Sequence, residues 1–198
     1  RARAFRDGVE ASQIISQTYL ISVYHTMPVI CLTTDPDNLW NEEYGALADG
    51  PNIDKSTSTP WFKNATYGQK NWFPAWLEYT DENGQLQISQ GVRFRIMGQY
   101  SLDMPQKSMF IKADGQFGKS EFDYALFDDR PYTTYKSFVL RNGGQDGLYT
   151  RVMDGLEARI IDQADSTLVT QSWKPVIVYI DGEYWGHYNL REKINKHF

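Results

Sequence analysis

One stretch of the 198-residue chain combines residue types that could bind a phosphate group. The segment GVRFRIMGQYSLDMPQKSMFIKA, residues 91–113, holds two strand-like runs separated by a loop that begins at Gly98 and ends at Lys107. A glycine at a strand end lets backbone N–H groups turn toward an anion, and a lysine on the returning strand adds a positive charge. The pattern therefore suggests phosphate chemistry, although an ordinary loop with a solvated lysine would look the same.

Two carboxylates downstream could hold that lysine in place. Asp154 and Glu157 lie three residues apart in a segment whose apolar residues recur at helical spacing, so both project from one side of the predicted helix. Either carboxylate could pair with Lys107 and direct it toward a phosphate. The alternative is that both belong to a solvated helix face.

Other kinds of chemistry have no recognisable motif. His25, His187 and His197 are too dispersed to make a metal-ligand motif, and no nucleophile elbow is present. The single cysteine, Cys31, lies in the apolar run PVICL and is predicted to be a buried thiol. The many aromatic residues could line a sugar-binding face, but in a β-rich protein they more often pack in the core. We therefore predict no metal site.

The composition is that of a folded globular protein that does not grip nucleic acid. Hydrophobic residues make up 41% and charged residues 23% of the chain, as in ordinary soluble domains. The formal net charge of -5 argues against generic binding to nucleic acid or to an anionic membrane. No apolar run is long enough to span a bilayer, and the first residues lack the apolar core of a secretion signal.

The elements that must position these residues are mostly strands. We predict an α+β fold with a dominant antiparallel sheet, one main helix over 147–163 capped by Asp146, and a long surface loop over 46–69. Asp181 and Gly182 separate two β-rich runs and predict a type I′ hairpin. Leu156 and Ile160 on the helix are expected to pack on the sheet. Six strand residues are predicted to be buried: Phe94, Ile96, Phe138, Leu140, Val178 and Ile180.

Four segments together resemble the spore-coat protein H (CotH) kinase-like family. These segments are MPVICLTTDPDNLW, PQKSMFIKA, KSFVLRNGGQD and KPVIVYIDGEYWGHYNLREKI, and their order and spacing also match. The similarity covers about residues 27–198. Residues 1–22 look like the final strands of a chitobiase C-terminal-like β-sandwich, a module that commonly precedes this family in exported bacterial proteins.

The resemblance implies the N-lobe of an atypical protein-kinase-like fold, which binds ATP and magnesium and passes phosphate to serine hydroxyls of a partner protein. It implies that the loop from Gly98 to Gln106, which includes Ser101, covers the nucleotide phosphates and that Lys107 contacts them. It also implies that the helix with Asp154 and Glu157 braces this lysine. The segment 188–192, with Leu190 and Glu192, is similar to the hinge that meets adenine. The implied location is extracellular, at the cell surface or in the spore coat.

Two departures from the family pattern leave other functions open. The family's catalytic and metal-binding aspartates lie in a C-lobe beyond REKI, so we expect this chain alone to have no catalytic base, no magnesium site and no turnover. The family's loop usually carries an arginine where this chain has Leu102, with Asp103 beside it, and its helix usually has Arg-Asp where this chain has Met153 and Asp154. A pseudokinase and a non-catalytic surface or binding module therefore remain alternatives. The oligomeric state is left open.

Overall fold

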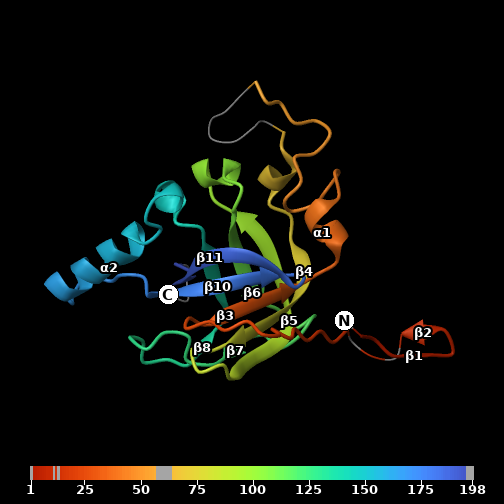
Figure 1. Cartoon of the computed structure of the whole chain (residues 1–198), viewed down its shortest axis with the longest axis horizontal. Helices are drawn as coiled ribbons and strands as arrows, with labels where there is room; N and C mark the ends of the chain where they lie inside the picture. The colour runs from red at the N-terminus through yellow and green to blue at the C-terminus, as the bar shows by residue number, and fades with distance from the viewer. Residues whose placement is uncertain (1, 11, 13, 57–63, 195–198) are drawn as a thin grey trace.

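Seven strands form a closed β-barrel from which one helix and an N-terminal hairpin project (Figure 1). The structure is a computed structural model that describes residues 2–10, 12, 14–56 and 64–194. Its elements, in chain order, are β1 (Phe5–Arg6), β2 (Val9–Glu10), β3 (Val29–Thr33), α1 (Pro36–Trp40), η1 (Thr66–Gln69), β4 (Phe73–Thr80), β5 (Leu86–Met97), η2 (Tyr100–Asp103), β6 (Ser108–Ala113), β7 (Phe122–Asp123), β8 (Thr134–Tyr135), β9 (Ser137–Arg141), η3 (Gly144–Leu148), α2 (Met153–Ala164), β10 (Trp173–Ile180) and β11 (Glu183–Glu192). No described helix is long and apolar enough to cross a membrane.

The closed barrel corrects the predicted fold class, which was an α+β fold with a dominant antiparallel sheet and one main helix, resembling a kinase N-lobe. The strand order is β10-β11-β9-β6-β5-β4-β3, and all neighbours are antiparallel except β3 and β10, which pair in parallel and close the ring. In that pair Val29 lies opposite Ile177, and Leu32 opposite Ile180. Closure removes the two unpaired edges that an open sheet would leave, so the backbone groups of both strands are satisfied.

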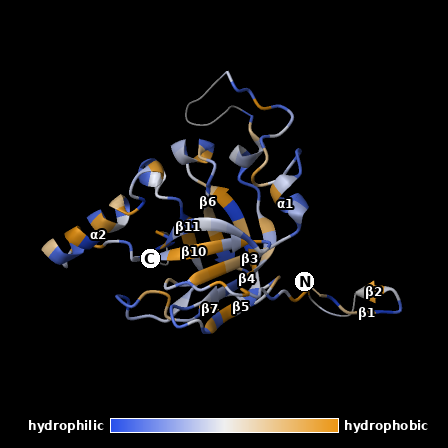
Figure 2. Ribbon diagram, in the orientation of Figure 1, coloured by the Kyte–Doolittle hydropathy of each residue, from blue (hydrophilic) through white to orange (hydrophobic). Residues whose placement is uncertain are grey.

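Alternation along the strands fills the barrel interior, as the sequence predicts. The six strand residues expected in the core are all buried: Phe94, Ile96, Phe138, Leu140, Val178 and Ile180. Tyr79 and Tyr188, the largest fully buried side chains, share this core. Figure 2 shows apolar stretches on the barrel strands interrupted by polar positions, the pattern of a sheet with one face buried.

The predicted hairpin between β10 and β11 is confirmed. Asp181 and Gly182 have φ angles of 50° and 86°, the positive values that a type I′ turn requires at both central positions. The flanking residues Ile180 and Glu183 are paired. The Asp181 carboxylate also accepts a hydrogen bond of 2.8 Å from the Thr34 amide, so the turn is tied to the end of β3.

The main helix is shorter than predicted and presents its apolar stripe to solvent. Residues 144–148 form the short 3-10 helix η3, and Arg151 has a φ of 64°, so the α-helix begins only at Met153. The predicted cap is wrong in position, because Val152 is the N-cap residue of α2 and makes no side-chain cap bond; Asp146 lies in η3, from where its carboxylate accepts from the Met153 amide at 3.1 Å. The expectation that Leu156 and Ile160 pack on the sheet is wrong, since they are 49% and 56% exposed.

Gly155, which has no side chain, explains why α2 approaches the barrel with the face opposite its apolar stripe. A Cβ atom at Gly155 would lie 2.3 Å from the Trp173 ring, so only a glycine lets the helix approach this closely. Gly155 and Ala158 are its buried residues. The apolar stripe therefore predicted the helix correctly but not the side that the helix buries.

The N-terminal residues form a small hairpin beside the barrel. The strand pair β1 and β2 turns at Asp7 and Gly8, where the sequence predicts a break, and an isolated bridge joins Ala2 to Ile15. The following residues are extended but belong to no strand. The assignment of residues 1–22 to a separate upstream β-sandwich remains a prediction.

Candidate functional site

Three segments that lie far apart in the sequence meet at one end of the barrel. They are the loop between β5 and β6, the turn after β9, and the middle of β11. The Asn142 side-chain amide donates to the Gln106 carbonyl at 2.7 Å, and its oxygen accepts from the Ser108 hydroxyl at 2.9 Å. The Gln106 side-chain amide in turn donates to the His187 carbonyl at 2.8 Å. The motifs PQKS, RNGGQD and GEYWGHYN therefore form one hydrogen-bonded unit.

Lys107 lies at the centre of this unit and is buried, with 7% of its surface exposed. Its ammonium donates to the carbonyl oxygens of Leu102 at 2.6 Å and Met104 at 3.2 Å. The same ammonium lies 3.9 Å from the centre of the Tyr67 ring, a cation–π distance. The lysine thus points back into its own loop, and the loop folds over the lysine.

Burial and charge act in opposite directions on this lysine. Removal from water lowers the pKa of the Lys107 ammonium, while the nearby carboxylates of Asp103 and Asp49 favour its charged form. Asp103 also accepts a hydrogen bond of 3.3 Å from the Tyr67 hydroxyl. The carboxylates that act on Lys107 therefore come from the loop and from the segment before β4.

The two predicted loop residues, Gly98 and Ser101, shape the turn that encloses Lys107. Gly98 has a φ of 133°, and a Cβ atom there would lie 2.5 Å from the Ser101 hydroxyl oxygen. Only a glycine fits at this corner without displacing that side chain. The Leu102 side chain is fully buried in the barrel core, so it points away from solvent and not toward a ligand.

Asp154 does not hold Lys107 but joins two arginines on the outer face of the barrel. Its carboxylate accepts a hydrogen bond from Arg141 on β9 and another, of 3.1 Å, from Arg191 on β11. The predicted pairing of Lys107 with the helix carboxylates is therefore wrong. Glu157, one turn further along α2, is exposed. Asp154 instead attaches the start of α2 to two neighbouring strands.

The segment predicted as a hinge lies inside the barrel wall. Leu190 is fully buried and is paired with Lys174 on β10 and with Leu140 on β9. Strands on both sides use the backbone hydrogen-bonding groups here, and an adenine ring would need such groups to be free. The pairing does not support this segment as an adenine contact.

The Glu192 side chain also has structural partners. It is 3% exposed and accepts hydrogen bonds from Arg130 at 2.9 and 2.7 Å, from the Ser172 amide at 2.9 Å, and from the Tyr132 hydroxyl. A buried carboxylate with this many donors is fully compensated. Glu192 therefore ties the loop before β9 and the start of β10 to the end of β11.

Arg151 places a further positive charge at the mouth of the site. Its guanidinium donates to the Gln106 side chain at 2.5 Å and to the His187 carbonyl at 3.3 Å. Its own backbone carbonyl accepts from the side-chain amide of Asn189 at 2.5 Å. Burial and the Arg151 charge both lower the pKa of His187, so this imidazole favours its neutral form.

The arrangement fits a phosphate better than a magnesium ion. Lys107 and Arg151 are two cations joined through one loop, and the site has glycines in the left-handed region at residues 143 and 144. Across the described residues, no group of three His, Cys, Asp or Glu side chains could hold a metal ion. His197, considered with the other histidines above, lies outside the described residues.

Sequence reasoning missed several residues that build this site. Tyr67 comes from the segment predicted as a surface loop, yet it is 2% exposed and contacts Lys107. Asn142 and Arg141 belong to the RNGGQD motif, and Arg191 to REK, but no role was assigned to them. The motifs were the only sequence signal at these positions. Their roles could not be predicted, because the contacts join strands that only the closed fold brings together.

A comparison with protein-family models agrees with this convergence of motifs. The model described as CotH kinase protein matches residues 94–198, just over half of the chain. The matched region begins in β5 and includes the loop, Lys107, the turn after β9, α2 and β11. No curated protein matches the chain.

Proposed function

Because this chain belongs to the CotH kinase protein family, we propose that it contributes the phosphate-binding part of a kinase domain. In that domain phosphate passes from ATP to serine hydroxyls of a partner protein. The observation that carries the proposal is Lys107, a buried lysine under a loop in a region that the family model covers. Burying an ammonium group costs free energy, and this cost favours a functional role for the charge of Lys107.

Binding of a phosphate at Lys107 requires the loop to open. The ammonium now donates to two loop carbonyls, and phosphate oxygens would replace them as stronger, charged acceptors. Arg151 would move together with the loop, because the Gln106 side chain that it contacts belongs to that loop. We propose that these two bonds mark a closed conformation of the loop, in which it covers its own lysine.

Transfer itself needs groups that the described residues do not supply. Among them no carboxylate cluster could hold magnesium, and the candidate carboxylates Asp154 and Glu192 are bonded to arginines. From the family resemblance we propose that the catalytic base and the metal ligands belong to a C-lobe outside these residues, and that these residues alone do not transfer phosphate. The surface or spore-coat location implied by the family remains a prediction.

Calorimetric titration of the chain with Mg-ATP tests the proposal. We expect saturable binding that Lys107→Met weakens by about tenfold or more, since one charged contact to phosphate is lost. Lys112→Met on β6, the strand that directly follows Lys107, is the matched control and should bind as the wild type does. Hydrogen exchange of residues 98–107 should increase when the nucleotide binds, because the closed loop must open.

A non-catalytic binding module is the second candidate. It is favoured by the β11 backbone, which is paired on both sides, and by Lys107, whose ammonium already has protein acceptors. Absence of Mg-ATP binding, or binding that Lys107→Met leaves unchanged, would favour this module and reject the phosphate site. Binding of ATP without any transfer by the longer protein would instead favour a pseudokinase.

A further inference from the structure

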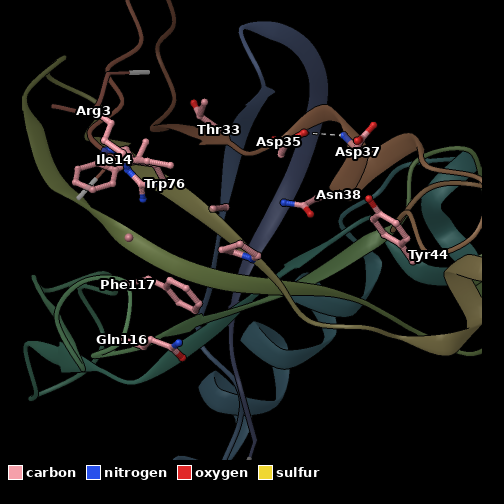
Figure 3. Close-up of a pocket in the computed structure, with 13 residues that line it drawn as sticks. Arg3, Ile14, Thr33, Asp35, Asp37, Asn38, Tyr44, Trp76, Gln116 and Phe117 are labelled. Atoms are coloured by element: carbon pink, nitrogen blue, oxygen red, sulfur yellow. Dashed lines mark hydrogen bonds between the residues drawn. The ribbon is translucent and has the colours of Figure 1, made fainter. Parts of the chain in front are cut away.

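A cavity opens beside the end of β3 and the first half of β4, and Lys107 is not among the residues that line it. Its volume is about 600 Å³, in the range of small-molecule sites. Figure 3 shows Arg3, Ile14 and Trp76 at one end of it, with Asp35, Asp37, Asn38 and Tyr44 at the other. Gln116 and Phe117 lie on a third side. Four separate parts of the chain therefore surround one space.

The polar end of this pocket is held by a hydrogen-bonded chain. The Asn38 side-chain amide donates to the Thr34 hydroxyl at 2.8 Å, and that hydroxyl donates to the Pro74 carbonyl at 2.6 Å. The Asp35 carboxylate caps α1 by accepting from the Asp37 amide at 3.1 Å. Among the described residues no donor is recorded on the Asp37 carboxylate, which is exposed at the pocket. Its oxygens can therefore accept from a ligand.

Two glycines place an aromatic side chain at the pocket. A Cβ atom at Gly91 would lie 1.8 Å from the Phe117 carbonyl oxygen, and one at Gly118 would lie 2.5 Å from the Gly91 carbonyl oxygen. The loop that carries Phe117 can lie on β5 only because both side chains are missing. An ion pair of 2.9 Å between Arg93 and Asp114 fixes the start of this loop. These contacts fix the backbone of the loop and so hold Phe117 beside the pocket.

The indole of Trp76 is fixed in a similar way. Its ring nitrogen donates to the Ser89 hydroxyl on β5 at 3.1 Å, so its polar atom is satisfied by the protein. The carbon surface of the ring is half-buried and lines the pocket. Trp76 and Phe117 therefore provide apolar surface, while Asp35 and Asp37 provide acceptors across the same space.

From this combination we propose that the pocket binds a neutral oligosaccharide. Sugar rings have an apolar C–H face that packs on aromatic rings and hydroxyl groups that donate to carboxylates, so they match both ends of the space. The lining carries both signs of charge, with Arg3 at one end and Asp35 and Asp37 at the other, which disfavours a purely cationic ligand. The proposal does not depend on the nucleotide site, because Lys107 does not line this pocket.

Titration of the whole chain with cellotetraose and with chitotetraose tests the proposal. We expect at least one of them to bind with a dissociation constant of about 1 mM or lower. Trp76→Ala should weaken binding by about tenfold, and Asp37→Ala by about threefold, since each removes one kind of contact. Tyr184→Ala is the matched control: Tyr184 is 59% exposed, contacts Tyr179 and does not line the pocket, so this variant should bind as the wild type does.

Other results would overturn the sugar site. One is that neither sugar gives any heat of binding at about 10 mM. Another is that the wild type and both pocket variants bind sugar equally. A third is that tetralysine binds instead of sugar, which would identify a cation site. Asp37 is exposed at the start of a helix, so Asp37→Ala should fold even if Trp76→Ala does not. Amide chemical shifts of residues 33–38 should move with sugar and not with ATP, which separates this result from that for the nucleotide site.

Discussion

Replacing Leu102 tests the most unexpected feature of the phosphate loop, because this side chain is part of the barrel core. Leu102 is completely buried, and Leu102→Ala removes about three carbon atoms from a packed site. At about 0.8 kcal/mol for each buried methylene, the lost transfer energy is about 2.4 kcal/mol. Adding a cavity that closes only in part, we expect the free energy of unfolding to fall by about 3 to 4 kcal/mol.

Urea unfolding followed by tryptophan fluorescence measures this loss. The control is Leu148→Ala, because Leu148 is 74% exposed and its removal should change stability by less than about 0.5 kcal/mol. If Leu102→Ala lowered the unfolding free energy by less than about 1 kcal/mol, the side chain would not be packed as described. The inference that this loop closes over the core would then be wrong.

The same burial determines what the family's usual arginine would do at position 102. With an arginine at position 102, a guanidinium would enter the core unless the loop moved, at a cost of several kcal/mol. We expect the double variant Leu102→Arg with Asp103→Ser to be destabilised and to bind Mg-ATP no more tightly than the wild type. Unchanged stability with tighter binding would show that the loop binds nucleotide in a different conformation.

Three further predictions follow from buried charged or ionisable groups. Asp154→Ala should lower the unfolding free energy by about 2 kcal/mol, because it leaves Arg191, 8% exposed, without its carboxylate, whereas Glu157→Ala should have little effect. Since burial lowers the pKa of Lys107 below its ordinary 10.5, the unfolded chain binds more protons between the two values. The stability of the wild type relative to Lys107→Met should therefore rise as the pH approaches 10.5, and a difference independent of pH would contradict this. Burial raises the pKa of the Cys31 thiol to about 11, so iodoacetamide at neutral pH should modify it only after unfolding, and fast labelling of the native chain would show that it is accessible.

Local patterns in the sequence predicted the strands and the hairpin, because these depend on neighbouring residues. Alternation identified core residues such as Phe94 and Val178, and the Asp181–Gly182 pair identified its turn. Each of these signals lies within a few residues, where periodicity and turn chemistry determine the structure. They position most of the barrel wall.

Contacts between distant segments could not be predicted in the same way. The apolar stripe with Leu156 and Ile160 predicted an inward face, but the small residue Gly155 decides which side of α2 approaches Trp173. Lys107 was expected to pair with a carboxylate and instead donates to backbone carbonyls, which carry no side-chain signal. Spacing alone cannot show that a loop folds back on its own lysine.

The parallel pairing of β3 with β10 has a consequence for how the chain is made. Val29 and Ile177 are about 150 residues apart in sequence, yet their strands must join before the wall is complete. During synthesis β3 emerges early and must wait for β10, with its apolar residues unpaired in the meantime. Contacts at such separation also slow folding, because a long loop must close first. A ribosome-bound intermediate that ends before β10 should therefore be prone to aggregation and depend on chaperones.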